Sequence, residues 1–189
     1  MTKGPPVTFR TILRALAPAL LLAGLSAAAH AGAVEDCRST AQVTNASLLA
    51  ACTAVIDGKQ ASASDTAYAY YRRALVGSAN PQADQALIMA DVSKAIELDP
   101  RLMEAFAFRA LGYNRALQHD KAIADLSSAI ALAPDRWGLY SLRAMIEAQK
   151  KDDKAAIADF KAALARNPPA SSADMIRQRI SKLEQKSAQ

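Results

Sequence analysis

The side chains that could perform chemistry are few in this 189-residue sequence. It has two cysteines, Cys37 and Cys52, and two histidines, His30 and His119. Two cysteines without neighbouring histidines cannot complete a tetrahedral zinc site, so we expect no metal. His119 has no neighbours that would orient it as a catalytic base, and we interpret it as a surface residue. Because glycine-rich phosphate loops are also absent from the sequence, we expect no cofactor and no enzymatic activity.

The two cysteines follow a segment with the features of a secretory signal. Residues 1–31 begin with basic residues, continue with an apolar run from Ala15 to Ala29, and end in a small–x–small cleavage site at Ala31. An uncleaved membrane anchor is the alternative, but the run is short of the ~20 residues that a spanning helix needs. We therefore expect a periplasmic or secreted protein without stable membrane insertion after cleavage.

The expected export of the protein bears on the oxidation state of the two cysteines. In an oxidising compartment a disulfide between Cys37 and Cys52 is the first expectation, and two buried free thiols are the alternative. Cys37 is predicted on a short helix that starts near Glu35, and Asn45 is a candidate N-cap of the next helix. The disulfide would then attach a short helix to the rest of the fold.

Export also changes the charge. The whole chain has 23 basic and 18 acidic residues, a net charge of +5. Removal of Lys3, Arg10 and Arg14 leaves 20 − 18 = +2, so the basic character of the full sequence does not indicate nucleic-acid binding.

Arginines and aspartates recur at matched positions. Each arginine is followed by an aspartate at a nearly constant spacing, which is slightly longer in the first case. If the helices that carry them pack together, bidentate ion pairs would fix the helix orientation. The alternative is that both residue types face water separately. The arginines are Arg73, Arg109 and Arg143, and the aspartates are Asp91, Asp125 and Asp159.

These residues lie on helices that repeat with a fixed period. Pro100, Pro134 and Pro168 are equally spaced along the chain, and each ends a similar helical phrase. Each phrase carries small residues and one larger apolar residue on a single face, and a partner helix with an aromatic residue precedes it. The interval of about 34 residues between the prolines is typical of stacked helix–turn–helix units.

In these phrases the chain resembles the tetratricopeptide repeat family over residues 67–168. The resemblance implies an all-α, right-handed superhelix of stacked antiparallel helix pairs. It also implies an exported bacterial protein with a two-cysteine partial repeat at residues 32–66, after the signal at 1–31. Residues 169–189 read as an amphipathic capping helix that Ser171, Ser172 or Asp174 could start. Leu117 departs from the family pattern because it replaces the usual turn glycine, and Glu147 replaces a large residue.

In this family the first helix of each unit usually lines a concave groove that binds a partner. Chaperone-tail-binding relatives place lysines and asparagines there, but this sequence has Ala107, Ser141, Leu111 and Met145 in those slots. The resemblance therefore implies a groove for an apolar or helical segment. The alternative is that the C-terminal helix fills this surface. The predicted groove residues are Tyr68, Tyr71, Leu75, Glu104, Ala107, Leu111, Asn114, Arg115, Ser141, Met145 and Gln149, with Ala148 beside them.

We expect a monomeric scaffold that binds an unknown protein or peptide. The alternative function is a structural protein of the cell envelope that self-associates, through Trp137 and an exposed end of the array.

Overall fold

The computed structural model describes residues 31–39, 44–58 and 60–187. The predicted signal peptide falls almost entirely on residues 1–30, outside the described residues. The described residues form helices and contain no strand. After a helix over residues 31–38 come α2 (Asn45–Gly58), α3 (Ala63–Gly77), α4 (Gln85–Leu98), α5 (Met103–Arg115), α6 (His119–Leu132), α7 (Trp137–Gln149), α8 (Asp153–Leu164) and α9 (Ala170–Ser187).

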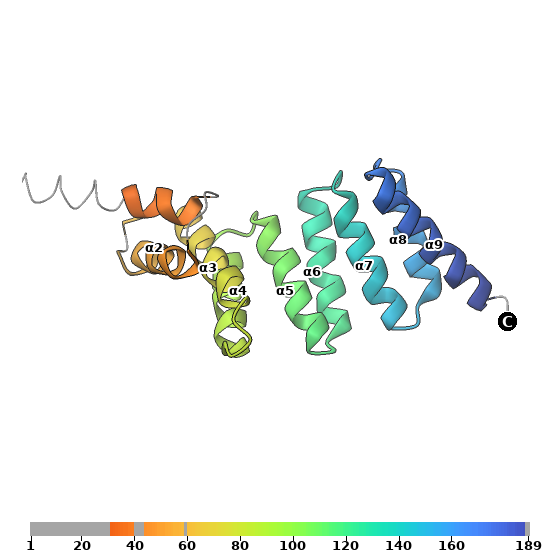
Figure 1. Cartoon of the computed structure of the whole chain (residues 1–189), viewed down its shortest axis with the longest axis horizontal. Helices are drawn as coiled ribbons and strands as arrows, with labels where there is room; N and C mark the ends of the chain where they lie inside the picture. Colours follow the sequence, from red (N-terminus) through yellow and green to blue (C-terminus); the bar gives the residue numbers. More distant parts are fainter. Residues whose placement is uncertain (1–30, 40–43, 59, 188–189) are drawn as a thin grey trace, which may run out of the picture.

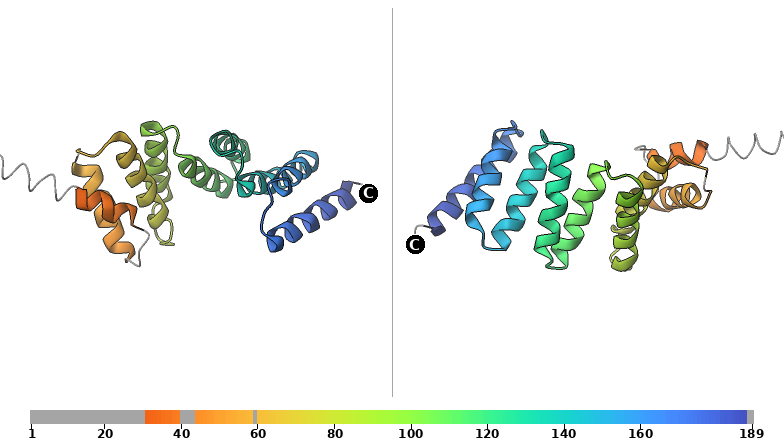
Figure 2. Two further views of the ribbon diagram at one scale, coloured as in Figure 1. Left: turned by 90° about the horizontal axis from the view of Figure 1, so that it is seen from above. Right: turned by 180° about the vertical axis from the view of Figure 1, so that it is seen from behind.

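The helices form an elongated array in which neighbours in sequence are neighbours in space (Figure 1). Three antiparallel hairpins, α3/α4, α5/α6 and α7/α8, stack one after another. Helix 31–38 and α2 lie at one end and α9 lies at the other, as both views of Figure 2 show. The fold is an all-α superhelix, as predicted. The boundary predicted at residue 67 falls within α3, which begins at Ala63.

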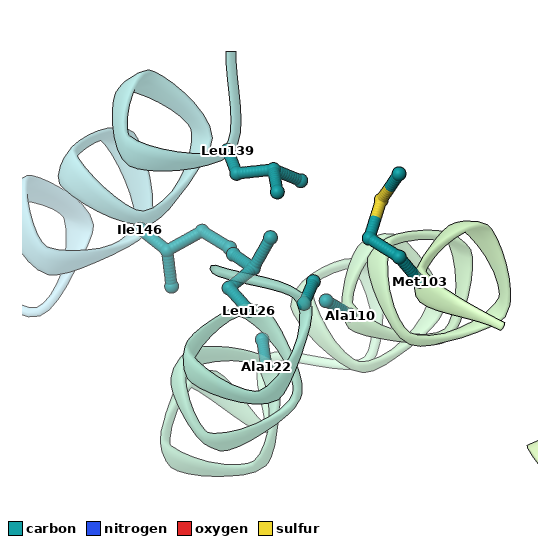
Figure 3. Packing of buried hydrophobic residues seen from close by; sticks show 7 residues of the cluster. Met103, Ala110, Ala122, Leu126, Leu139 and Ile146 are labelled. Atoms are coloured by element: carbon teal, nitrogen blue, oxygen red, sulfur yellow. The ribbon is translucent and has the colours of Figure 1, made fainter. Parts of the chain in front are cut away.

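The second helix of each hairpin supplies the centre of the core. Val92, Leu126 and Phe160 are at most 1% exposed at equivalent positions, and Cys52 is fully buried at the same position of α2. Burial of one such apolar side chain stabilises the fold by ~1.5–3 kcal/mol. Figure 3 shows Leu126 of α6 between residues of α5 and residues of α7. Successive hairpins therefore share one continuous core.

Small residues allow the helices to approach closely. Ala110 of α5 and Ala144 of α7 are fully buried. Gly112 of α5 packs against the Met89 side chain of α4, and an added Cβ there would collide with the Met89 sulfur. This contact joins the first hairpin to the second.

The turns inside the second and third hairpins have left-handed backbone. Leu117 has φ 58° and Lys151, at the equivalent position of the next hairpin, has φ 64°. Glycine adopts this region without a steric penalty, and leucine and lysine do not. Leu117, which replaces the glycine usual in the family, therefore leaves strain in a turn whose backbone matches that of the turn at Lys151. Its side chain is 77% exposed.

The N-terminal end confirms the disulfide and corrects two details. Cys37 and Cys52 are joined by a disulfide. The helix that carries Cys37 already covers residue 31, so its predicted start near Glu35 is wrong. Thr44, rather than Asn45, caps α2, because its hydroxyl accepts a hydrogen bond from the Ser47 amide at 3.1 Å.

The C-terminal helix also starts earlier than predicted. α9 begins at Ala170, directly after Pro169, so none of the three polar residues proposed as its start is the first residue. Its buried stripe is Ala173, Ile176 and Ile180. No helix among the described residues combines the length and apolar character needed to cross a membrane.

Candidate functional site

The arginine–aspartate pairs connect the two helices of each hairpin, as predicted. In the second hairpin, Arg109 Nε and Nη2 donate to the Asp125 carboxylate at 2.7 and 2.8 Å. The same bidentate arrangement joins Arg73 to Asp91 at 2.7 and 2.7 Å and Arg143 to Asp159 at 2.6 and 2.9 Å. In all three pairs the hydrogen bond to the carboxylate raises the pKa of the arginine.

Arg109 and Arg143 also reach the preceding hairpin, which the sequence did not lead us to predict. Arg143 Nη1 donates to Ser127 Oγ of α6 at 2.8 Å, and Arg109 Nη1 lies 3.4 Å from Ser93 Oγ of α4. Ser93 and Ser127 are separated by one repeat period, a recurrence that could have revealed this link. The result is a polar chain through the array that sets the register of each first helix against its neighbours.

Aromatic residues cover the predicted groove face of the first hairpin. Tyr68 and Tyr71 of α3 have ring centroids 5.9 Å apart, and Tyr71 meets Phe108 of α5 edge-on at 6.1 Å. Burial raises the pKa of Tyr71, and Glu104 nearby adds to that effect. Tyr68, Tyr71 and Leu75 are all half-buried, so these side chains are packed against their neighbours and present an apolar surface at the base of the groove.

The α5 part of the predicted groove is more open. Leu111 is 38% exposed, and Arg115 one turn later is also exposed. Asn114 is not free, because its Oδ1 lies 2.9 Å from the Nδ1 of His119. His119, the first residue of α6, is partly exposed, as expected for a surface residue, but it is held by Asn114.

The α7 part of the predicted groove lines a pocket. The pocket has a volume of about 500 Å³ and lies between α7, α8 and α9. Met145, Ala148 and Gln149 form its α7 wall. Phe160 of α8 contributes as well, and α9 supplies Arg179, Lys182 and Leu183. The capping helix therefore packs beside this surface without filling it. Ser141, earlier on α7, is half-buried and does not line the pocket.

A second hollow of about 410 Å³ lies between α2, α3 and α4. Leu49, Ile88 and the exposed Leu87 line it together with the Arg73–Asp91 pair. Sequence reasoning did not anticipate it, and none of the predicted groove residues contributes to it.

Glu147 is the one strongly perturbed acid of the described residues. Its side chain is 12% exposed, its Oε2 has no hydrogen-bond partner, and Arg143 Nε is 4.0 Å from its Oε1. Burial, with the nearby Asp159 charge, raises the pKa of Glu147 to about 7. The resemblance to the family would place a large residue here, so a half-buried carboxyl at this position is a departure from the family pattern.

The described residues hold no cluster of histidine, cysteine or acidic side chains that could bind a metal ion. Their arrangement offers a stacked helical scaffold with two hollows, and the one between α7, α8 and α9 has a basic edge formed by Arg179 and Lys182. Such a structure recognises a partner by shape and charge.

Comparison with known proteins supports the same class. Residues 109–181 match the family model described as "Tetratricopeptide repeat". A search of curated proteins gives no match. The helical array defines a repeat scaffold of the tetratricopeptide type, and residues 109–181 of the chain carry the sequence features of that repeat family.

Solved structures share the fold at low sequence identity. "Crystal structure of MamA" is 20% identical, covers 65% of this chain and 68% of its own, and has a TM-score of 0.57. A tetratricopeptide repeat protein from Parabacteroides merdae is 14% identical over 75% of this chain and 54% of its own, with a TM-score of 0.64. The first TPR of Spaghetti (RPAP3), bound to the HSP90 peptide SRMEEVD, is 19% identical over 67% of this chain and 96% of its own, with a TM-score of 0.59.

Proposed function

We propose that this protein is an exported scaffold that binds a segment of another protein along the face formed by α3, α5, α7 and α9. The observation that carries the proposal is the pocket of about 500 Å³, because Met145, Ala148 and Gln149, predicted groove residues, form its α7 wall. The binding of a chaperone peptide by a protein of the same fold supports a peptide-sized partner. Binding is by surface complementarity, and the scaffold has no catalytic role.

Two observations support export to an oxidising compartment. The sequence before residue 31 has the composition of a signal peptide, and Cys37 and Cys52 are disulfide-bonded. We propose a periplasmic or secreted location. Expression with the native N-terminus, followed by cell fractionation and N-terminal sequencing of the product, tests it. A product found in the cytoplasm with residues 1–31 intact would contradict the proposal.

The groove is tested with two matched leucine substitutions. Leu111 of α5 is 38% exposed on the proposed binding face, and Leu132 of α6 is 39% exposed on a second helix. Leu111→Glu places a charge on the binding face, whereas Leu132→Glu places the same charge elsewhere. Equal exposure means that both variants should fold equally well, which circular dichroism checks.

We expect affinity capture from an envelope extract to lose its specific partners with Leu111→Glu and to keep them with Leu132→Glu. If both variants capture the same partners as the unchanged protein, the groove assignment is wrong. A stricter variant adds charges at Tyr71 and Met145, but both side chains also contribute to packing.

Self-association as an envelope structural protein is the alternative. The structure gives less support for Trp137 as its contact, because this side chain is half-buried against the cluster that contains Tyr140 and Phe160. We propose a monomer. Light scattering on the mature protein would show a defined oligomer if the alternative is correct.

A further inference from the structure

The cations of α9 divide into two groups. Two of them are engaged in ion pairs, whereas Arg179 and Lys182 form none with the described part of the chain. Both unpaired cations are exposed, and both line the pocket beside α7. The engaged pairs are Arg177 with Asp174 at 2.7 Å and Lys186 with Asp153 at 2.7 Å.

The wall opposite these cations is apolar. Met145 and Ala148 of α7 and Phe160 of α8 face the pocket, with Leu183 from α9 beside them. Methionine adapts its shape to different apolar partners. A volume of about 500 Å³ is in the range of known ligand pockets.

No acidic side chain lines this pocket. Gln149 is neutral, and the nearest acid along α7, Glu147, is directed to the Arg143–Asp159 pair. The positive charge of Arg179 and Lys182 is therefore not compensated within the pocket. A ligand would have to bring both an apolar group and a negative charge.

We propose that this pocket binds an acidic segment of a partner protein, with an aliphatic side chain against Met145 and carboxylates against Arg179 and Lys182. The inference rests on the proposed function and specifies the chemistry of its partner. The chain's own residues 1–30 do not fit this description, because they contain no aspartate or glutamate. The recognition differs from that of the chaperone-tail-binding relatives, whose lysines and asparagines lie on the first helices, because here the charges come from the capping helix.

The test starts from short random peptides displayed on phage and selected against the mature protein. We expect enriched peptides to combine acidic and aliphatic residues. A labelled copy of one enriched peptide is then titrated by fluorescence anisotropy against the double variant Arg179→Gln/Lys182→Gln. Arg177→Gln is the control, because it removes a charge from the same helix outside the pocket.

We expect the double variant to bind roughly tenfold more weakly, and Arg177→Gln to bind as the unchanged protein does. Added salt should weaken binding to the unchanged protein and have little effect on the double variant. A second arm compares a peptide in which the acids are replaced by their amides. Its binding should be weak to all three proteins.

Three results would overturn the inference. Peptides without acidic residues, or equal binding by the double variant, would show that Arg179 and Lys182 do not select the partner. In either case, the Leu111→Glu variant is titrated with the same peptide. If Leu111→Glu abolishes peptide binding, the proposed groove stands and only its charge preference is wrong. If Leu111→Glu binds the peptide normally, the groove proposed as the binding face is wrong too. Equal competition by heparin or anionic lipid vesicles would show general anion binding.

Discussion

Asp125 is the best single test of the polar chain that joins the hairpins. Its side chain is 9% exposed and accepts both hydrogen bonds from Arg109, whose side chain is 19% exposed. In the Asp125→Ala variant, Arg109 would keep only a weak hydrogen bond to Ser93 at 3.4 Å and its contacts with the rings of Phe106 and Tyr113. A buried charge would then lack its partner.

The burial of the pair sets the expected loss in the free energy of unfolding for Asp125→Ala. Removal of one partner of a fully buried pair costs about 3–5 kcal/mol. Because Arg109 retains some solvent, we expect a loss of about 2–3 kcal/mol in the free energy of unfolding. For a chain of this size each kcal/mol lowers Tm by roughly 2–4 °C, so Tm should fall by about 5–10 °C.

Calorimetry of the purified variant measures this change. Asp174→Ala is the matched control, since it breaks the Arg177 pair, in which the side chains are 64% and 68% exposed. We expect the control to change the free energy of unfolding by less than ~0.5 kcal/mol. An unchanged Tm for Asp125→Ala would refute the structural role of the pairs.

A double substitution separates the pair from the space that it fills. Replacement of Arg109 and Asp125 together by leucines removes both charges, and replacement of a buried pair by apolar residues is often close to neutral. The double variant should therefore be more stable than Asp125→Ala alone. If the double variant were less stable than Asp125→Ala, the ion pair itself would stabilise the fold, beyond the cost of leaving Arg109 without its partner.

Three further predictions follow from other parts of the fold. Leu117→Gly should raise stability by about 0.5–1 kcal/mol in thermal unfolding, because it relieves the strain of a left-handed backbone; a loss would contradict this. Glu147 is protonated in the folded protein up to about pH 7 but in the unfolded chain only up to about 4.5, so the stability of the wild type should fall as pH rises through that interval. Glu147→Gln should remove that fall, worth about 1–2 kcal/mol after solvent screening, and equal pH profiles of variant and wild type would contradict it. Reduction of the Cys37–Cys52 disulfide should cost about 3 kcal/mol and increase hydrogen exchange in helix 31–38 and α2, with little change in α6 to α8; uniform loss of protection would contradict a local effect.

The features that repeat were predictable from the sequence. The constant repeat period defines the helix pairs, and the buried Val92, Leu126 and Phe160 are the apolar residues of the repeated phrase. The arginine–aspartate pairs were predictable for the same reason, since two residue types that recur together must share an environment. The disulfide followed from the number of cysteines and the expected compartment.

Features that occur once were harder to predict. The hydrogen bond between Asn114 and His119 has no counterpart in the third hairpin, so no pattern revealed it. Arg166 bonds the carbonyl of Pro134 and donates to Tyr140 Oη at 2.6 Å, and it too lacks an equivalent in the sequence. The pocket could not be predicted because it depends on the distance between α7 and α9. The packing of large side chains sets that distance, and local sequence does not.

The arginine–serine contacts that link successive hairpins end at α8. Ser93 and Ser127 accept from the arginine of the following hairpin, but the equivalent residue one repeat period further on is Lys161. Lys161 instead pairs with Glu184 of α9 at 3.2 Å. A gene duplication that inserted another hairpin after α8 would thus bring an arginine against a lysine, and growth of the protein by duplication at this point would require a change at residue 161.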